Sequence, residues 1–461
     1  MRRRGRLAAV AALAVVAGFA SSGLAAPTPA GSVRLGPLLR VQTPGGTPVS
    51  CPFESEPEIA HTAAGTWVAY NDDSGCPLIA SQLRLTGLQL LPANGGPRRY
   101  INLPQAWKSF GYYSGDPDLT PDPQSKSGVL LASLIENDQG LQVGVVRVSP
   151  SGRASLLPSP SLSTSDDKEF IAGDLGPHSK YRGRSYLAWD DVAHGTIVVR
   201  AFDGHQWLPA ATVDQGSGYP DVSVAPNGDV AVAYVSAVGV TVRTSLDGGR
   251  TFGDKVSPLR GNGPGRDDPS CPLRPTIAQR QRAMKGPHVA WDSRGRLHVI
   301  ASLSTPGLGL ETGSVGAGTG GEGTVFHAVS ADRGFTFSKQ LPVSNAETSE
   351  VQWAPAIAVL PDGGVAVSYL QTAQTTSYDA LIAVQPAGAT RFGSPVLLSE
   401  GHGPLPAATE AVGNSNCYGI GDYTGLAPTP DGVVADWPTT VGVQTSYVDS
   451  DIAVRQVHVT S

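Results

Sequence analysis

The sequence is poor in charge, because Lys, Arg, Asp and Glu make up only 16% of its 461 residues, against about 25% in an average soluble domain. The scarcity of Lys and Glu, together with 38 Pro, excludes a coiled coil. The lack of a Gly-X-Y period excludes collagen despite 56 Gly. An apolar share of 40% excludes disorder of the whole chain, since disorder needs low hydrophobicity. What remains is a large all-β protein with many turns.

Long apolar segments are also lacking beyond the N-terminus. Residues 7–19 form an apolar stretch that is short for a membrane span, preceded by four Arg and followed by small residues at 23–26. This order predicts a secretory signal peptide over residues 1–26 and a mature, extracellular chain over 27–461. The alternative is an uncleaved membrane anchor.

The charge of the mature chain bears on its partners. Loss of the four Arg leaves 29 basic residues (33 − 4) against 39 acidic ones. An acidic exported protein is a poor ligand for nucleic acid. We therefore expect no nucleic-acid partner, no membrane span after cleavage, and a monomer.

Cysteine is scarce, with four residues, and neither a CxxC nor a paired-His spacing is present, which argues against zinc. An even count in an exported chain favours disulfides. A bond between Cys51 and Cys76 would close a short loop and is the first pairing we expect. Cys271 and Cys417 then pair by elimination. Free buried thiols are the alternative.

An internal repeat organises the chain. Each copy has a short polar start, often with Pro, then an apolar strand, a Gly turn and a second apolar strand, as in VSVAPNGDVAVAYVS. Asn-Gly and Asp-Gly turns at 227–228 and 362–363 indicate hairpins. Successive copies lie 51 to 68 residues apart, which suits one four-stranded propeller blade each. The seven copies align at Glu58, Asp118, Glu169, Asp221, His288, Pro355 and Tyr423.

The turn after the third strand carries a common motif, Ser-x-Asp-x-Gly-x-Thr-Phe, in two of the copies. The Asp carboxylate can accept hydrogen bonds from turn N–H groups, and Gly supplies the special φ. We expect the Phe to pack between neighbouring sheets, so the motif is structural. The motif is similar to the Asp box. Because of this motif, the chain resembles secreted bacterial sialidase-like (BNR-repeat) β-propellers. The motif residues are Ser245, Asp247, Gly249, Thr251 and Phe252, and Ser330, Asp332, Gly334, Thr336 and Phe337.

Closure of the ring is also predicted from the sequence. The seventh copy ends at residues 451–459 with three strands, one short of a blade. Residues 32–43, SVRLGPLLRVQT, form an orphan strand that we expect to supply the fourth. The sequence therefore predicts a seven-bladed β-propeller in one sialidase-like domain. Six blades, the number in the resembled sialidases, are the alternative.

Acidic residues gather on one face of such a propeller. This face, here called the mouth face, holds the starts of the inner strands and the ends of the second strands, and the Asp boxes lie opposite. The resemblance implies an active site on it, and the long loops 91–115, 254–285, 306–322 and 398–420 are expected there. The candidate catalytic residues are Glu58, Asp118, Asp221, His288 and Tyr423, and the candidates for substrate binding are Asp72, Asp190, Asp422, Trp107 and Tyr113.

Two chemistries fit these acids. Paired carboxylates can act as general acid and base on a glycosidic bond. Alternatively, oxygens of the central channel hold a cation such as Ca²⁺. No other cofactor is expected. The structural alternative is that each acid caps a strand start and accepts hydrogen bonds from backbone N–H groups.

The resemblance implies a glycosidase-like protein that acts on extracellular glycans. The sialidase mechanism needs three Arg around the substrate carboxylate, a Tyr nucleophile paired with a Glu, and an Asp acid/base. No inner-strand start carries Arg, and Arg40 lies in the expected closing strand, so no catalytic residue is carried over. Two interpretations stay open: a glycoside hydrolase or lyase, and a non-catalytic propeller that binds a glycan, a protein or the cell wall. A convergent pair of acids with one raised pKa would favour the enzyme.

Overall fold

The computed structural model describes residues 32–41, 54–72, 85–105, 111–216, 218–261, 286–304, 323–344, 350–374, 377–404, 421–443 and 448–460. These residues form strands and turns without a helix. Nowhere in this part of the chain do residues form a helix with the length and apolar character needed to cross a membrane. The N-terminal 31 residues, and with them the expected signal peptide, lie outside the described part.

The strands form seven antiparallel sheets, here called blades I to VII. Blade I holds β2 (Glu54–Thr62), β3 (Gly65–Asp72), β4 (Thr86–Pro92) and β5 (Arg99–Tyr100), and blade II holds β6 (Gly111–Tyr113), β7 (Asp118–Pro121), β8 (Val129–Asn137), β9 (Gly140–Val148) and β10 (Ala154–Leu156). Blade III holds β11 (Asp166–Gly173), β12 (Ser185–Asp191), β13 (Thr196–Phe202) and β14 (Ala211–Gln215), and blade IV holds β15 (Asp221–Val224), β16 (Val230–Ser236), β17 (Gly239–Ser245) and β18 (Val256–Arg260). Blade V holds β19 (His288–Trp291), β20 (Leu297–Ser304), β21 (Gly323–Ser330) and β22 (Leu341–Pro342), and blade VI holds β23 (Gln352–Val359), β24 (Val365–Gln374), β25 (Ser377–Gln385), β26 (Val396–Leu397) and β27 (Gly403–Pro404). Blade VII holds β28 (Leu426–Thr429), β29 (Gly432–Val443), β30 (Val448–Thr460) and β1 (Ser32–Val41).

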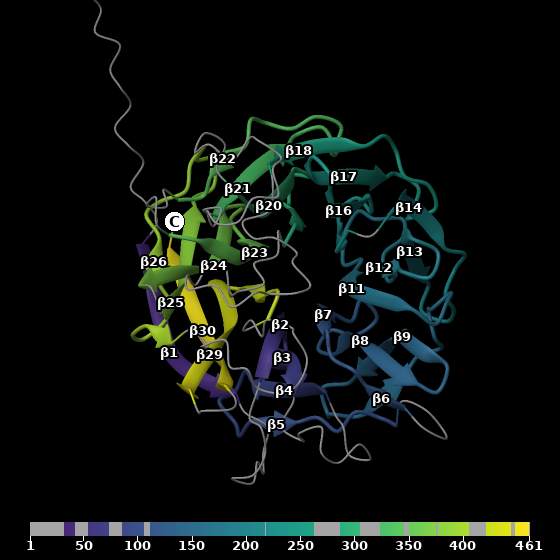
Figure 1. The fold of residues 1–461 in the computed structure, drawn as a ribbon, viewed down its shortest axis with the longest axis horizontal. Helices are drawn as coiled ribbons and strands as arrows, with labels where there is room; N and C mark the ends of the chain where they lie inside the picture. Colours follow the sequence, from purple (N-terminus) through teal and green to yellow (C-terminus); the bar gives the residue numbers. More distant parts are fainter. Residues whose placement is uncertain are drawn as a thin grey trace, which may run out of the picture. The chain divides into compact units, whose positions relative to one another are not determined.

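The blades surround a common axis, as Figure 1 shows. The inner strands contact one another in the order β2, β7, β11, β15, β19, β23 and β28, and β28 contacts β2 again. The ring is closed by β1, which pairs antiparallel with β30 from Ser32↔Thr460 to Val41↔Ile452. The predicted seven-bladed propeller, with an N-terminal strand that completes the last blade, is confirmed.

Three expected mouth loops are corrected by the structure. Residues 99–100 and 111–113 of the predicted loop 91–115 form β5 and β6, residues 256–260 of the loop 254–285 form β18, and residues 403–404 of the loop 398–420 form β27. In β18 an apolar residue explains the difference, since Leu259 is buried in an outer position of blade IV. Outer strands this short carry little periodic signal in the sequence.

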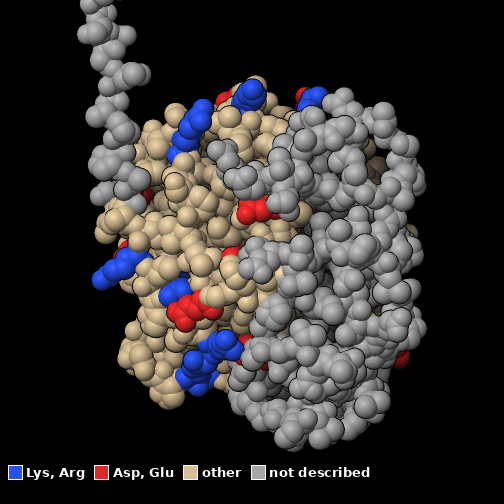
Figure 2. All heavy atoms as spheres, turned by 60° about the vertical axis from the view of Figure 1, so that its left-hand side comes forward, with Lys and Arg blue, Asp and Glu red and all other residues tan. Residues whose placement is uncertain are grey.

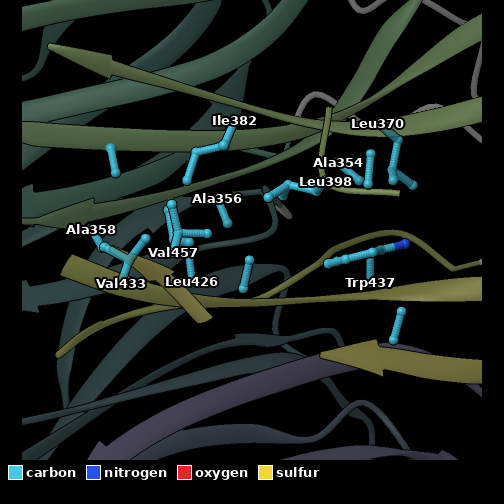
Figure 3. Close-up of a cluster of buried hydrophobic side chains, with 14 of the residues drawn as sticks. Ala354, Ala356, Ala358, Leu370, Ile382, Leu398, Leu426, Val433, Trp437 and Val457 are labelled. Atoms are coloured by element: carbon cyan, nitrogen blue, oxygen red, sulfur yellow. The ribbon is translucent and has the colours of Figure 1, made fainter. Parts of the chain in front are cut away.

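The core lies between the faces of adjacent blades. Between blades VI and VII, side chains of β23 to β25 face those of β28 to β30, with Leu370 and Ile382 on one side and Trp437 on the other (Figure 3). Strand alternation sends every second residue into this layer. Removal of a fully buried side chain of this size costs about 2–5 kcal/mol, so sheet-to-sheet packing holds each blade in place.

The two turns that carry the Ser-x-Asp-x-Gly-x-Thr-Phe motif join blades on the face opposite the mouth. Asp332 accepts hydrogen bonds from the backbone N–H of Thr336 at 2.8 Å and from its hydroxyl at 2.6 Å, and these bonds lower the pKa of Asp332 to about 2. The neighbouring Arg333 binds Asp229 of blade IV through two contacts of 2.6 Å. Phe252 and Phe337 pack against buried clusters between blades. The turns therefore bind one blade to the next.

A buried histidine pair in blade V makes the fold sensitive to acid. His298 on β20 and His327 on β21 stack with ring centroids 5.2 Å apart, and His298 Nδ1 lies 3.0 Å from His327 Nε2. Burial, then the neighbouring His298 and Arg296, lowers the pKa of His327 to about 3. The unfolded chain therefore binds a proton at this site more readily than the folded one does.

We expect this depressed pKa to reduce stability as the pH falls from about 6.5 toward 3, by on the order of 4 kcal/mol at the acid end. Urea unfolding at pH 7.5, 5.5 and 4 should show a smaller acid loss in His327→Gln than in the wild type. The exposed His205→Gln variant is the control and should follow the wild type. Equal acid losses in all three proteins would contradict this explanation.

Candidate functional site

A β-bulge interrupts the inner strand of a blade near the mouth face. The ladder shifts register between Ser55 and Glu58 in blade I, between Asp167 and Phe170 in blade III, and between Trp353 and Ala356 in blade VI. In each bulge one residue has a left-handed φ. The equivalent residues of the seven blades, here called the bulge ring, are Glu56 (φ 47°), Asp116 (49°), Lys168 (53°), Tyr219 (50°), Gly286 (49°), Ala354 (45°) and Gly421 (104°).

The bulge ring corrects the alignment of two repeats. In the first six blades, the inner-strand ladder below the bulge begins two residues after the ring member. The first residue of this ladder is Phe170 in blade III and Ala356 in blade VI, one position beyond the predicted Glu169 and Pro355. The residue that follows the ring member is Pro in five blades. In blades III and VII this position holds Glu169 and Asp422 instead.

Strain concentrates in this ring. Of the six residues other than Gly with a positive φ in the described ranges, five are ring members. A left-handed conformation costs about 1–2 kcal/mol for a residue with a Cβ, and bulges of this kind re-aim side chains. In the first four blades the residues with this left-handed conformation are Glu56, Asp116, Lys168 and Tyr219. In the last three blades the ring member is Gly or Ala. Charged and aromatic groups therefore come from one half of the ring.

Lys168 lies at the centre of these groups. Its Nζ contacts Asp116 Oδ2 of blade II at 2.8 Å and Asp422 Oδ2 of blade VII at 3.1 Å. Glu56 accepts hydrogen bonds from Asn71 Nδ2 at 2.7 Å and from the backbone N–H of Asp422 at 2.9 Å. Glu56, Asp116, Lys168 and Asp422, here called the Lys168 cluster, thus connect blades I, II, III and VII across the mouth.

The Lys168 cluster has unequal proton affinities. Burial, followed by the charge of Asp116, raises the pKa of Glu56 well above its usual range. Asn71, which donates to Glu56, accepts a hydrogen bond from the backbone N–H of Asp116 at 2.8 Å and so links the two acids. Burial opposes the charge of Lys168, but Asp116, Glu56 and Asp422 raise its pKa well above normal. Glu56 therefore takes up a proton more readily than an ordinary Glu, and Lys168 keeps its ammonium group in the pair with Asp116.

Most of the predicted catalytic acids lie deeper in the channel. Asp118 accepts hydrogen bonds from the backbone N–H groups of Leu119 and of Ile171 in the next blade. Asp221 accepts one from Val289 of the next blade at 2.8 Å. Burial, then Asp118, Asp436 and Asp221, raises the pKa of Glu58. Asp118 and Asp221 connect blade to blade in the way that the structural alternative predicts.

The predicted His288 and Tyr423 form an aromatic group in the channel with Phe170. The Phe170 ring lies 5.7 Å from the ring of each, in edge-on contact. The Tyr423 hydroxyl donates to the carbonyl of Pro117 at 3.2 Å, and His288 Nδ1 lies 3.4 Å from Asp221 Oδ2. The three side chains come from blades III, V and VII. Burial, then the charges of Asp116 and Glu56, raises the pKa of Tyr423 well above its usual range, so Tyr423 borders the Lys168 cluster. His288 pairs with Asp221 instead.

Asp436, on the second strand of blade VII, should make the stability of the fold depend on pH. Burial raises its pKa to about 8, although its Oδ1 accepts a hydrogen bond from Gly425 at 2.7 Å. A pKa raised on folding gives stability that is present below pH 4 and is lost as the pH rises toward 8. Asp436→Asn keeps the acceptor and removes the charge.

We expect Asp436→Asn to raise the unfolding free energy at pH 8.5, by on the order of 5 kcal/mol, and to change it little at pH 4.5. Denaturant unfolding at both pH values measures this, with the exposed Asp138→Asn as control. The explanation fails if the variant shows the same stabilisation at both pH values.

The predicted binding residues are placed separately. Asp190 accepts hydrogen bonds from the N–H groups of Gly218 and Tyr219, which fixes the approach to the bulge in blade IV. Asp72 is buried and accepts from the Tyr100 hydroxyl at 3.4 Å. Tyr113 is buried, and its hydroxyl has no partner among the described residues. Of this set, Asp422 joins the Lys168 cluster. Trp107 and the four cysteines, with their expected disulfides, lie outside the described residues.

The expected cation is not supported by the donors that the structure describes. In those ranges no group of three or more His, Cys, Asp and Glu side chains is arranged to hold a metal ion. The ammonium group of Lys168 lies between the mouth carboxylates instead. A buried Lys beside Asp116 and Asp422 supplies the positive charge that Ca²⁺ would bring.

Sequence reasoning missed three groups of the mouth. Lys168 and Asn71 bind the cluster acids, and Tyr112 donates to Glu136 at 2.6 Å on the mouth end of blade II. Lys168 stands between two acids at a repeat start, and that pattern was the available signal. Its partner Asp422 is 254 residues away, so only ring closure brings the two together.

Comparisons with known proteins return structures but no family. No protein-family model matches the sequence, and no curated protein does. Similar solved structures include a polysaccharide lyase (7% identity, 88% of this chain and 90% of that chain, TM-score 0.49). An ulvan lyase (11%, 87% and 94%, 0.47) and the NanB sialidase from Streptococcus pneumoniae (10%, 91% and 70%, 0.40) are also similar. A sialidase is therefore among the structures that this seven-bladed propeller resembles.

Proposed function

We propose that the protein is a secreted, carbohydrate-active β-propeller whose reaction centre is the Lys168 cluster. One observation carries the proposal: Glu56 and Asp116, on strained bulges of two blades, are linked through Asn71 at the channel mouth while Lys168 pairs with Asp116. Strained residues, convergent acids and one raised pKa together are typical of acid–base sites. The signal-like N-terminus supports an extracellular location for the protein, where glycans are accessible to it.

The cluster favours Glu56 as the proton donor and Asp116 as the base, because burial raises the pKa of Glu56 while Asp116 is paired with Lys168. The protonated Glu56 donates to the leaving glycosidic oxygen, and the Asp116 carboxylate takes a proton from water, whose oxygen bonds to the sugar carbon. In an elimination Asp116 takes the proton from a sugar carbon instead. Asp116 has the most exposed side chain of the cluster, at 16%.

A binding-only propeller is the second candidate, and one observation favours it. Lys168 Nζ lies 5.4 Å from the centroid of the Tyr219 ring, which is also a ring member. A cation beside an aromatic ring at a channel mouth can hold a ligand without chemistry. The two candidates differ in whether product forms.

Product release from a panel of sialosides and plant, algal and bacterial polysaccharides, read by mass spectrometry, tests the proposal. We expect release by the wild type, loss in a Glu56→Gln, Asp116→Asn double variant, and retention in Asp362→Asn, an exposed turn variant on the opposite face. Product mass separates hydrolysis, which adds water, from elimination. A folded wild type that binds a glycan of the panel without release would favour the binding-only function.

A further inference from the structure

A cavity of about 390 Å³ opens between blades VI and VII, away from the bulge ring. Its walls come from the mouth-side ends of β25, β29 and β30, from the closing strand β1, and from residues 399–403 that follow β26. None of the lining residues belongs to the Lys168 cluster. The cavity lies within the volume range of small-ligand pockets, about 300–1,000 Å³.

The floor of this cavity is apolar. Trp437 and Tyr378 line it, and each is only 2% exposed. Tyr378 is fixed because its hydroxyl donates to the carbonyl of Pro438 at 2.8 Å. Leu38 of β1 and Ala453 of β30 complete the floor. A rigid floor of this kind suits the C–H face of a flat, compact ligand.

The rim of the cavity is polar and holds both donors and acceptors. His402 binds Asp379 through Nδ1 at 2.9 Å, which orients the half-exposed imidazole and leaves Nε2 for a ligand. Ser399 donates to the same Asp379 oxygen at 3.2 Å. Arg40, with half its side chain exposed, lies 3.6 Å from the buried Asp451. The rim groups are thus held in place before any ligand arrives.

Charges of both signs lie around the cavity. Arg40 stands near Asp451, Glu400 contacts Arg455 at 3.2 Å, and His402 faces Asp379. Figure 2 turns this side of the molecule forward and shows basic and acidic side chains next to each other on it. Balanced charges create no field that would select an anion or a cation. Hydroxyl groups, which both donate and accept, match such a rim.

We propose that this cavity binds one unit of a neutral saccharide, as a site separate from the channel mouth. The sugar's C–H groups lie against the floor formed by Leu38, Tyr378, Trp437 and Ala453, and its hydroxyls bind His402 Nε2, Ser399 and Arg40. Binding here needs no reaction at Glu56. A glycan chain held at this site has a raised local concentration at the mouth face of the same molecule.

Saturation-transfer NMR on the full chain tests the site, with methyl glycosides of glucose and galactose as neutral probes and those of glucuronic acid and glucosamine as charged ones. We expect transfer to a neutral glycoside, and a dissociation constant that rises about tenfold in His402→Ala and in Arg40→Ala. The matched control is His458→Ala, which removes a similar His–Asp pair at the other end of β30. Glu56→Gln should bind as the wild type does, which separates this site from the proposed reaction centre.

Three outcomes would overturn the proposal. They are transfer to none of the probes, a preference for the charged glycosides, and equal transfer in the wild type, His402→Ala and Arg40→Ala. Thermal unfolding of each variant shows whether it is folded. Arg40→Ala changes the closing strand β1 and His402→Ala the segment between β26 and β27, so we do not expect both variants to fail to fold.

Discussion

Replacing Lys168 by Met should lower the unfolding free energy by about 3–5 kcal/mol at pH 7.5. The ammonium group is the partner of Asp116 and Asp422, and all three side chains are largely buried. Without it, two buried carboxylates face each other beside Glu56 and must either stay ionised or take up protons. Proton uptake is easier in acid, so the loss should be smaller at pH 5 than at pH 8. Denaturant unfolding at these pH values measures the effect.

A double-mutant cycle with Asp422→Asn shows whether the loss of stability comes from the unpaired carboxylates. Removal of the Asp422 charge should recover part of the loss caused by Lys168→Met, because one fewer carboxylate is then left unpaired. The exposed Lys126→Met is the control and should cost less than about 0.5 kcal/mol. A Lys168→Met effect that is equal at pH 5 and pH 8, or unchanged by Asp422→Asn, would show that the loss comes from packing rather than from charge.

The second large effect separates the mouth acids from the deeper ones. Glu56→Gln should lower kcat by about a hundredfold or more on a glycan that the wild type cleaves, because it removes the proton that Glu56 donates. It also costs about 1–3 kcal/mol of stability, because the amide oxygen keeps the Asp422 N–H but the NH2 group meets Asn71 Nδ2, which is a donor. Asp118→Asn places a donor near Leu119 or Ile171 and costs a similar amount, but should change kcat less than tenfold.

Both variants are read by initial rates and by denaturant unfolding on the same preparations. A loss of kcat confined to Asp118→Asn would move the reaction centre down the channel, to the residues that the sequence first suggested. Equal kcat losses in both variants would mean that the acids act as one network.

Much of the fold was predictable because its repeat is local. Alternating apolar strands and Gly turns mark each hairpin, and the orphan strand at 32–43 was needed to complete the seventh blade, as β1 does. The register errors at Glu169 and Pro355 have a physical cause. Ring members include Glu, Asp, Lys, Tyr and Ala, so the left-handed conformation that sets the register is not marked by Gly.

The candidate site was predictable in part. The acid-rich mouth was expected, and the bulges move its convergent members to Glu56 and Asp116, two residues before the predicted Glu58 and Asp118. Contacts such as those of Lys168 with Asp422 depend on ring closure, which brings blade III opposite blade VII. No local pattern contains that information.

The most direct test of the central proposal is a crystal structure of the Glu56→Gln variant soaked with a glycan that the wild type cleaves. The proposal predicts a saccharide oxygen or reacting carbon within hydrogen-bond reach of the Asp116 carboxylate, at the centre of the bulge ring. A glycan bound elsewhere, with its scissile bond far from Asp116 and Lys168, would contradict it.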